Sequence, residues 1–129
     1  MMAMLFLNLP VKDLPASREF FGKLGFAFND DFSDDRAASL VLGSDAHVML
    51  LTEEFFATFT GKSLADAAKT TEMIAAIGVD TRQRVDEIVD TALAAGGQAS
   101  QETSEQEGMY GRSFQDLDGH LWEVVYMGN

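Results

Sequence analysis

The sequence predicts the same order of elements twice, about 68 residues apart, and this repeat constrains the fold more than any other feature. In the first half, residues 5–9 form an apolar run typical of a strand. Asp13 before Leu14-Pro15 predicts a capped helix, which Gly25 ends. Three further strands are expected, at residues 26–28, 38–42 and 48–52. The first half therefore has the order β-α-β-β-β.

The second half predicts the same five elements. A strand at 73–79 is followed by a helix that begins at Asp80-Thr81 and ends at Gly96-Gly97. Three more strands are expected, at residues 98–102, 112–116 and 121–127. Few residues are identical between the halves, so the repeat depends on element order.

These patterns predict a single α+β domain over residues 1–129. Module one covers residues 1–52 and module two covers residues 72–129. A connector at residues 53–71 is expected to form two short helices. Its phenylalanines, Phe55, Phe56 and Phe59, are expected to pack on this subunit or on another one.

Composition excludes several classes of partner. The formal net charge of -12 disfavours nucleic acids and anionic membrane surfaces, which reward basic residues. There is no cysteine, so disulfides and thiolate chemistry are absent. The apolar N-terminus has no basic residue and meets Pro10, which favours a strand over a signal peptide. No apolar run reaches the roughly 18 residues of a membrane span. A cytoplasmic protein is expected.

The segment Asp116-Leu117-Asp118-Gly119-His120-Leu121-Trp122-Glu123 contains the most informative side chain. Asp118-Gly119 between two apolar runs predicts a hairpin. The strand that follows places Glu123 on one face with Val125 and Met127. A buried carboxylate needs a metal, a cation or a proton, so the partner of Glu123 decides the chemistry.

Together with Leu9-Pro10-Val11-Lys12-Asp13-Leu14 and the paired modules, this closing segment resembles the vicinal oxygen chelate superfamily. That group includes glyoxalase I (lactoylglutathione lyase), extradiol dioxygenases, and the bleomycin- and fosfomycin-resistance proteins. The resemblance covers the whole chain and implies two curled mixed sheets around a cup. It also implies a small-molecule ligand and a homodimer.

The resemblance further implies where a divalent metal would be held. The four corresponding positions are Phe6, Leu50, Ile74 and Glu123. Three of these are apolar and cannot coordinate a metal. Shifting the alignment by one residue restores no ligand set, so no metal and no cofactor are expected.

Other polar residues have both functional and structural interpretations. Tyr110 and Arg112 enter the penultimate strand, where family members often contact the ligand. Arg112 is expected either to neutralise Glu123 or bind an anionic substrate, or to pair with a surface acid. His47 and His120 are expected to be surface or structural residues.

The leading hypothesis is a metal-independent, homodimeric small-molecule binding protein with a mostly apolar cup. Its expected ligand-binding residues are Phe6, Asn8, Leu50, Thr52, Ile74, Ala76, Tyr110, Arg112 and Val125, beside Glu123. The alternative is a glyoxalase-like lyase or isomerase that uses Glu123 as its general base. A third possibility is that the phenylalanines of the connector fill the cup.

Overall fold

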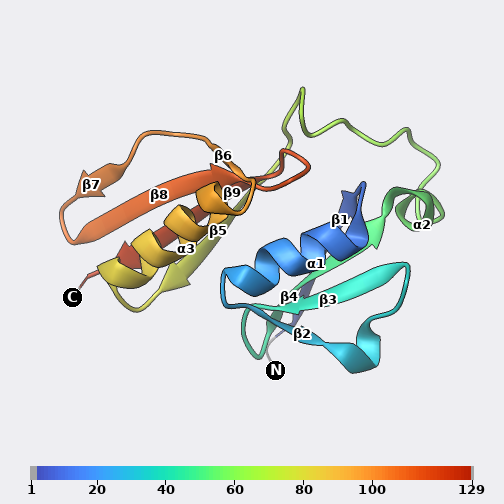
Figure 1. The fold of residues 1–129 in the computed structure, drawn as a ribbon, viewed down its shortest axis with the longest axis horizontal. Helices are drawn as coiled ribbons and strands as arrows, with labels where there is room; N and C mark the ends of the chain where they lie inside the picture. Colours follow the sequence, from blue (N-terminus) through green and yellow to red (C-terminus); the bar gives the residue numbers. More distant parts are fainter. Residues whose placement is uncertain (1–2, 129) are drawn as a thin grey trace. The chain divides into compact units, whose positions relative to one another are not determined.

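The computed structural model describes residues 3–128 and divides into two compact units, with the boundary between Leu64 and Ala65. Each unit has its own sheet and its own long helix (Figure 1). The α+β fold class with two mixed sheets is confirmed.

The first unit contains a four-stranded sheet in the order β1-β4-β3-β2. Its elements are β1 (Leu5–Val11), α1 (Leu14–Lys23), β2 (Ala27–Asn29), the 3-10 helix η1 (Asp30–Phe32), β3 (Ala37–Val41), β4 (Ala46–Thr52) and α2 (Glu53–Ala57). Strand β1 pairs parallel with β4, and the other pairs are antiparallel. Pro10 is tolerated because β1 is an edge strand.

The second unit contains a five-stranded sheet in the order β5-β9-β8-β6, with β7 also paired to β8. Its elements are β5 (Ile74–Val79), α3 (Arg82–Ala94), β6 (Gln98–Ala99), β7 (Ser104–Gln106), β8 (Met109–Gln115) and β9 (Leu121–Met127). Strand β5 pairs parallel with β9, as β1 does with β4.

Both helices begin at the predicted caps. The Asp13 side chain accepts a hydrogen bond from the Ala16 amide at 3.0 Å, and Thr81 accepts one from the Arg84 amide at 3.0 Å. Each helix buries an apolar stripe against one face of its own sheet. These stripes consist of Leu14, Phe20 and Phe21 in α1 and Val85, Ile88, Val89 and Ala92 in α3.

Two predicted elements differ from the structure. The expected strand at 98–102 is shorter in the structure, where only β6 at 98–99 forms, and the unpredicted short strand β7 follows at 104–106. Both pair with β8. The second helix of the connector is absent, and only α2 forms. Asp66 explains this difference, because its carboxylate accepts from the Ala68 amide and its carbonyl accepts from the Lys69 and Thr70 amides. Such local bonds favour a turn over a helix.

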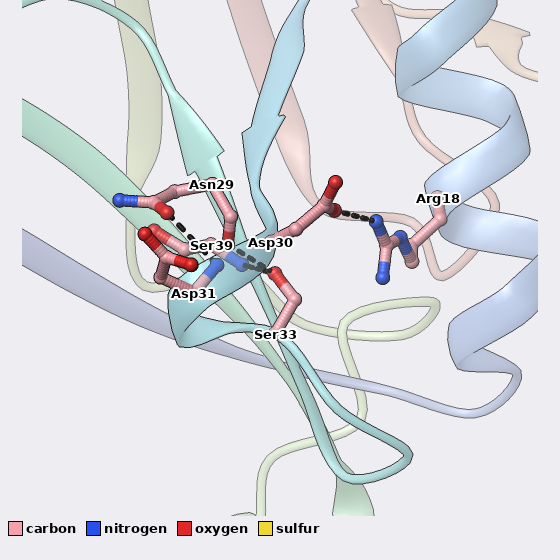
Figure 2. Close-up of polar contacts among 6 residues, drawn as sticks. All are labelled: Arg18, Asn29, Asp30, Asp31, Ser33 and Ser39. Atoms are coloured by element: carbon pink, nitrogen blue, oxygen red, sulfur yellow. Dashed lines mark hydrogen bonds and ion pairs between the residues drawn. The ribbon is translucent and has the colours of Figure 1, made fainter.

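The link between β2 and β3 is held by short-range polar contacts (Figure 2). Asn29 accepts from the Asp31 amide, and the Ser33 hydroxyl donates to the Asn29 carbonyl at 2.7 Å. That hydroxyl also accepts from the Ser39 amide at 3.0 Å. An ion pair between Arg18 and Asp30, also 3.0 Å long, ties the link to α1. These contacts indicate a structural role for the acidic residues Asp30 and Asp31 in this link.

Candidate functional site

The strand register of the second unit places Glu123 on the face of the sheet opposite to α3. Glu123 pairs with Ala76 on β5 and with Ser113 on β8. Residues paired across strands, and those two apart along a strand, share a face. Ile74, Ala76 and Val125 therefore lie on the Glu123 face, as the sequence predicted. Trp122 and Val124, which alternate with Glu123, are fully buried on the other face.

Beside Glu123 the sheet is hollowed, with a cavity volume of about 180 Å³. We call this cavity the Glu123 hollow. Its lining residues are Gln101, Glu102, Ser104, Met109, Gly111, Arg112, Ser113, Glu123 and Val125. All of them belong to β7–β9 or to the segment that precedes β7. The hollow is therefore built entirely within the second unit.

Glu123 is part-buried, and its carboxylate has no hydrogen bond or ion pair to any residue in the described part of the chain, 3–128. Its neighbour Ser113 is already engaged. The Ser113 hydroxyl accepts from the Gln101 amide at 2.7 Å and lies 3.3 Å from the Gln101 carbonyl, to which it donates. The Glu123 carboxylate is therefore an open, part-buried acceptor in the hollow.

Tyr110 and Arg112 lie on the other face of the sheet, toward α3, so the structure does not bring their side chains to Glu123. The Tyr110 hydroxyl donates to Asp86 at 2.6 Å. One Arg112 nitrogen lies 2.9 Å from carboxylate oxygens of both Asp86 and Asp90. The alternative in which Arg112 pairs with acids is confirmed, and neutralisation of Glu123 by Arg112 is wrong. Arg112 points away from Glu123 because side chains alternate between the two faces of β8, and Ser113, the next residue, is the one paired with Glu123.

This cluster has clear electrostatic consequences. Two hydrogen bonds lower the pKa of Asp86 below its ordinary value. The bond from Tyr110 has the larger effect, and the bond from Arg112 the next largest. The same bond to Asp86 raises the pKa of the Tyr110 phenol. The guanidinium of Arg82 lies 4.1 Å from the centroid of the Tyr110 ring. The cluster ties α3 to β8 and engages the Arg112 guanidinium with the acids of α3.

In the first unit, the register separates residues that were expected to share a face. Phe6 and Asn8 lie on the face opposite to α1, with Met49 paired to Asn8. Leu50 and Thr52 pair with Leu9 and Val11, and Leu50 is fully buried. The prediction that Leu50 and Thr52 share the face of Phe6 and Asn8 is therefore wrong. A shift of one residue moves a strand's side chains to the other face.

The repeat identifies Met49 as the first-unit counterpart of Glu123. The Asn8–Met49 pair lies three positions before Val11 on β1, and the Ala76–Glu123 pair lies three before Val79 on β5. The sequence prediction had placed this counterpart at Leu50.

His47 has an environment that the sequence did not predict. Its ring stacks on Phe6 with centroids 5.0 Å apart and an interplanar angle of 11°. Both ring nitrogens are buried, and neither has a hydrogen-bond partner within residues 3–128. His47 is therefore a structural residue packed on Phe6, with two buried nitrogens whose hydrogen-bonding capacity is unused within these residues. The sequence did contain one signal for this position: His47 and Leu50 are three residues apart on one strand, so their side chains lie on opposite faces of the sheet.

Asp116 organises the turn before β9. Its carboxylate accepts hydrogen bonds from the amides of Asp118 and His120 at 2.9 and 3.0 Å and from the Trp122 indole at 3.0 Å. Burial raises the pKa of the Asp116 carboxyl, although His120 and the three donors act in the other direction. His120 thus belongs to this buried cluster, with its side chain near Asp116.

Neither group of possible donors fits the transition-metal site that the fold family implies. Ligand atoms of Asp116, Asp118 and His120 lie within 4.8 Å of one another, but both Asp116 oxygens already accept hydrogen bonds, one from backbone amides of the turn and one from the Trp122 indole of β9. At Glu123 the facing residues are Ala76 and Ser113. A methyl group and an engaged hydroxyl do not complete a set of nitrogen, sulfur or carboxylate ligands.

Comparison with known proteins establishes the family. The sequence pattern of the Glyoxalase/Bleomycin resistance protein/Dioxygenase superfamily matches residues 3–124. The chain belongs to this superfamily. No curated protein matches the chain.

Solved structures share the fold of this chain. Hypothetical protein SA1046 from S. aureus is 31% identical, with a TM-score of 0.81 over 98% of this chain and 95% of that one. A glyoxalase/bleomycin resistance protein/dioxygenase family enzyme from Burkholderia phytofirmans is 18% identical, with a TM-score of 0.78 over 98% and 99%. The fosfomycin resistance protein FosX from Listeria monocytogenes, in complex with Mn(II) and sulfate, is 18% identical, with a TM-score of 0.70 over 100% and 92%.

Within residues 3–128, no helix is both long enough and apolar enough to cross a membrane.

Proposed function

We propose that this superfamily member binds a small, partly apolar molecule at the Glu123 hollow. The observation that carries the proposal is the part-buried carboxylate without a partner, in a cavity of about 180 Å³. A carboxylate taken out of bulk water needs compensation, and a bound molecule would supply it. Met109 and Val125 in the lining offer apolar contact, and Ile74 and Ala76 lie on the same face. Phe6 and Asn8, on the face of the first unit's sheet opposite to α1, are proposed as ligand contacts of that sheet itself.

We propose that binding needs no transition metal. Support comes from the residue types at the implied ligand positions, where Phe6, Met49 and Ile74 accompany Glu123. Elemental mass spectrometry on untagged protein, purified without chelator, tests this. Less than about a tenth of an equivalent of any transition metal is expected. Close to one equivalent per subunit would overturn this part of the proposal.

A fragment screen by ¹⁵N–¹H NMR tests binding itself. A true ligand is expected to shift the amide signals of Gln101, Gly111 and Ser113 in a saturable manner. Glu123→Gln should weaken that binding, because the open acceptor loses its charge. Glu107→Gln removes one charge from an exposed residue outside the lining and serves as the matched control. Equal loss in both variants would contradict a role for Glu123.

The second candidate is a glyoxalase-like lyase or isomerase in which Glu123 is the general base. The same unpartnered carboxylate favours it, because a base must be free to accept a proton. The test is formation of lactoylglutathione from methylglyoxal and glutathione. An enzyme of this kind should lose turnover in Glu123→Gln with little change in substrate affinity. A binding protein shows no turnover in either form.

We also propose that the two units are the two modules of one domain and that the protein is a homodimer. In support of a dimer, large apolar side chains are exposed, with Leu5 61%, Phe6 52% and Ile74 54% accessible. Sedimentation equilibrium should give twice the chain mass of 14.1 kDa. A monomer at micromolar concentration would contradict the dimer.

A further inference from the structure

The Glu123 hollow has two acidic residues in its lining, and its one basic residue is paired with acids of α3. Glu123 and Glu102 both line it, and Arg112 is the one basic residue among the described lining residues. The guanidinium of Arg112 is bonded on the other face to Asp86 and Asp90, at 2.9 Å from each. The chain as a whole has a net charge of -12, which adds to the negative potential at the hollow.

The two carboxylates of the hollow accept hydrogen bonds, whereas the Ser104 hydroxyl and the side-chain amide of Gln101 can both donate and accept. The Ser113 hydroxyl is already used by the Gln101 backbone. The Glu123 carboxylate can only accept hydrogen bonds while it is ionised. A ligand that fits this group must therefore donate. A ligand carboxylate or phosphate would instead place like charges together, which is unfavourable in a half-buried site.

Desolvation strengthens this preference. A ligand seated in the hollow removes water from the part-buried Glu123 carboxylate. A neutral apolar ligand would leave that charge without compensation, which costs free energy. A cationic donor restores the charge balance with a charge-assisted hydrogen bond.

The lining of the hollow also limits the size and polarity of the rest of the ligand. Met109 and Val125 provide an apolar wall, and the thioether of Met109 adapts to different shapes. The volume of about 180 Å³ is below the roughly 300–1,000 Å³ of pockets for drug-sized ligands. The hollow therefore suits a small molecule, or the charged end of a larger one.

We propose that the Glu123 hollow selects organic cations, namely protonated amines or amidines that carry a small apolar group. This inference rests on the proposed small-molecule binding function and specifies its ligand class. It assigns Glu123 as the charge partner of the ligand, and Met109 and Val125 as its apolar contacts. Arg112 is not assigned a contact with the ligand, because its guanidinium is paired with Asp86 and Asp90 of α3.

Three probes that share one ring test this selectivity: benzylamine, benzyl alcohol and benzoate. Each is titrated into ¹⁵N-labelled protein at pH 7 with EDTA, in low salt and again in 0.5 M NaCl. Benzylamine should shift the amide signals of Gln101, Gly111 and Ser113 and bind about tenfold more tightly than benzyl alcohol. Added salt should reduce this difference. Benzoate should bind more weakly than either.

The variants locate the effect. Glu123→Gln should weaken benzylamine binding about tenfold and leave benzyl alcohol unchanged. Glu107→Gln should change neither, which controls for overall charge. Thermal unfolding of both variants checks that the fold is retained.

The outcomes separate this inference from the function on which it rests. If benzyl alcohol or benzoate binds as tightly as benzylamine at these amides, the cation preference is overturned and the binding function stands. Weakening of benzylamine by Glu107→Gln as much as by Glu123→Gln would also overturn it. If no probe and no molecule of the fragment screen perturbs these amides, the binding function itself fails.

Discussion

Asp116 is expected to contribute more to stability than any other single acidic side chain of the second unit. The residue is 4% exposed, and its side chain accepts three hydrogen bonds around the turn before β9. Asp116→Ala would leave the His120 amide and the Trp122 indole buried without acceptors. Each such loss costs about 1–3 kcal/mol, so the free energy of unfolding should fall by about 2–5 kcal/mol. The Asp118 amide is part-buried and adds less.

Asp116→Asn refines the test, because an amide retains one acceptor oxygen. That oxygen can serve the two backbone amides, while the NH₂ group then faces the indole N–H of Trp122. One buried donor loses its partner, and a loss of about 1–3 kcal/mol is expected. The predicted order of stability is wild type, then Asp116→Asn, then Asp116→Ala.

Urea unfolding measures both variants, followed by far-UV circular dichroism and by fluorescence. Trp122 is the chain's one tryptophan, so its fluorescence also reports directly on the altered hydrogen bond. The exposed control, Glu107→Gln, should stay within about 0.5 kcal/mol of wild type. The reasoning is refuted if Asp116→Ala also stays within that range, or if Asp116→Asn is as stable as wild type.

Four further outcomes are expected. Because the pKa of Asp86 is lowered from 3.8, its contribution to stability is present above that value and lost as the pH falls, and Asp86→Asn should flatten the acid limb of a pH–stability curve. Because the pKa of Tyr110 is raised above 10.0, ultraviolet titration should show a late-ionising phenol that Tyr110→Phe removes. Gly119→Ala should lower stability by about 1–3 kcal/mol, since φ is +91° and the new Cβ would lie 2.8 Å from the Ala67 carbonyl; an unchanged melting temperature would contradict this. His47→Phe should raise stability by about 1 kcal/mol by removing two buried nitrogens without partners, and a loss on urea unfolding would contradict it.

Local patterns accounted for most of the fold. The caps at Asp13 and Thr81 lie where the sequence predicted them, because a cap needs only a side chain and the next three amides. The connector was harder to predict. Its apolar residues suggested a second helix, but hydrogen bonds at Asp66 stabilise a turn. Competition between such near-equal local structures is not decided by hydrophobic spacing.

In the candidate site, too, local features were predicted correctly and features that depend on neighbouring strands were not. The parity of Glu123, Val125 and Trp122 along β9 was predicted correctly, because alternation is a property of one strand. The face of Leu50 was predicted wrongly, and for Arg112 the structure decides between two open alternatives in favour of pairing with acids. Both depend on which residues lie opposite each other on neighbouring strands, and a shift of one residue reverses the face.

The sequence by itself determined the α+β class, the repeated order of elements, the helix caps and the position of Glu123 on its strand, since these depend on contacts between near neighbours in the chain. The tertiary structure decided that Ser113 and Ala76 face Glu123, that Met49 is its counterpart, and that Arg112 pairs with Asp86 and Asp90. These features depend on register between strands and on packing of α3 against its sheet. Such long-range pairings are set by the whole core at once, and no local stretch of sequence encodes them.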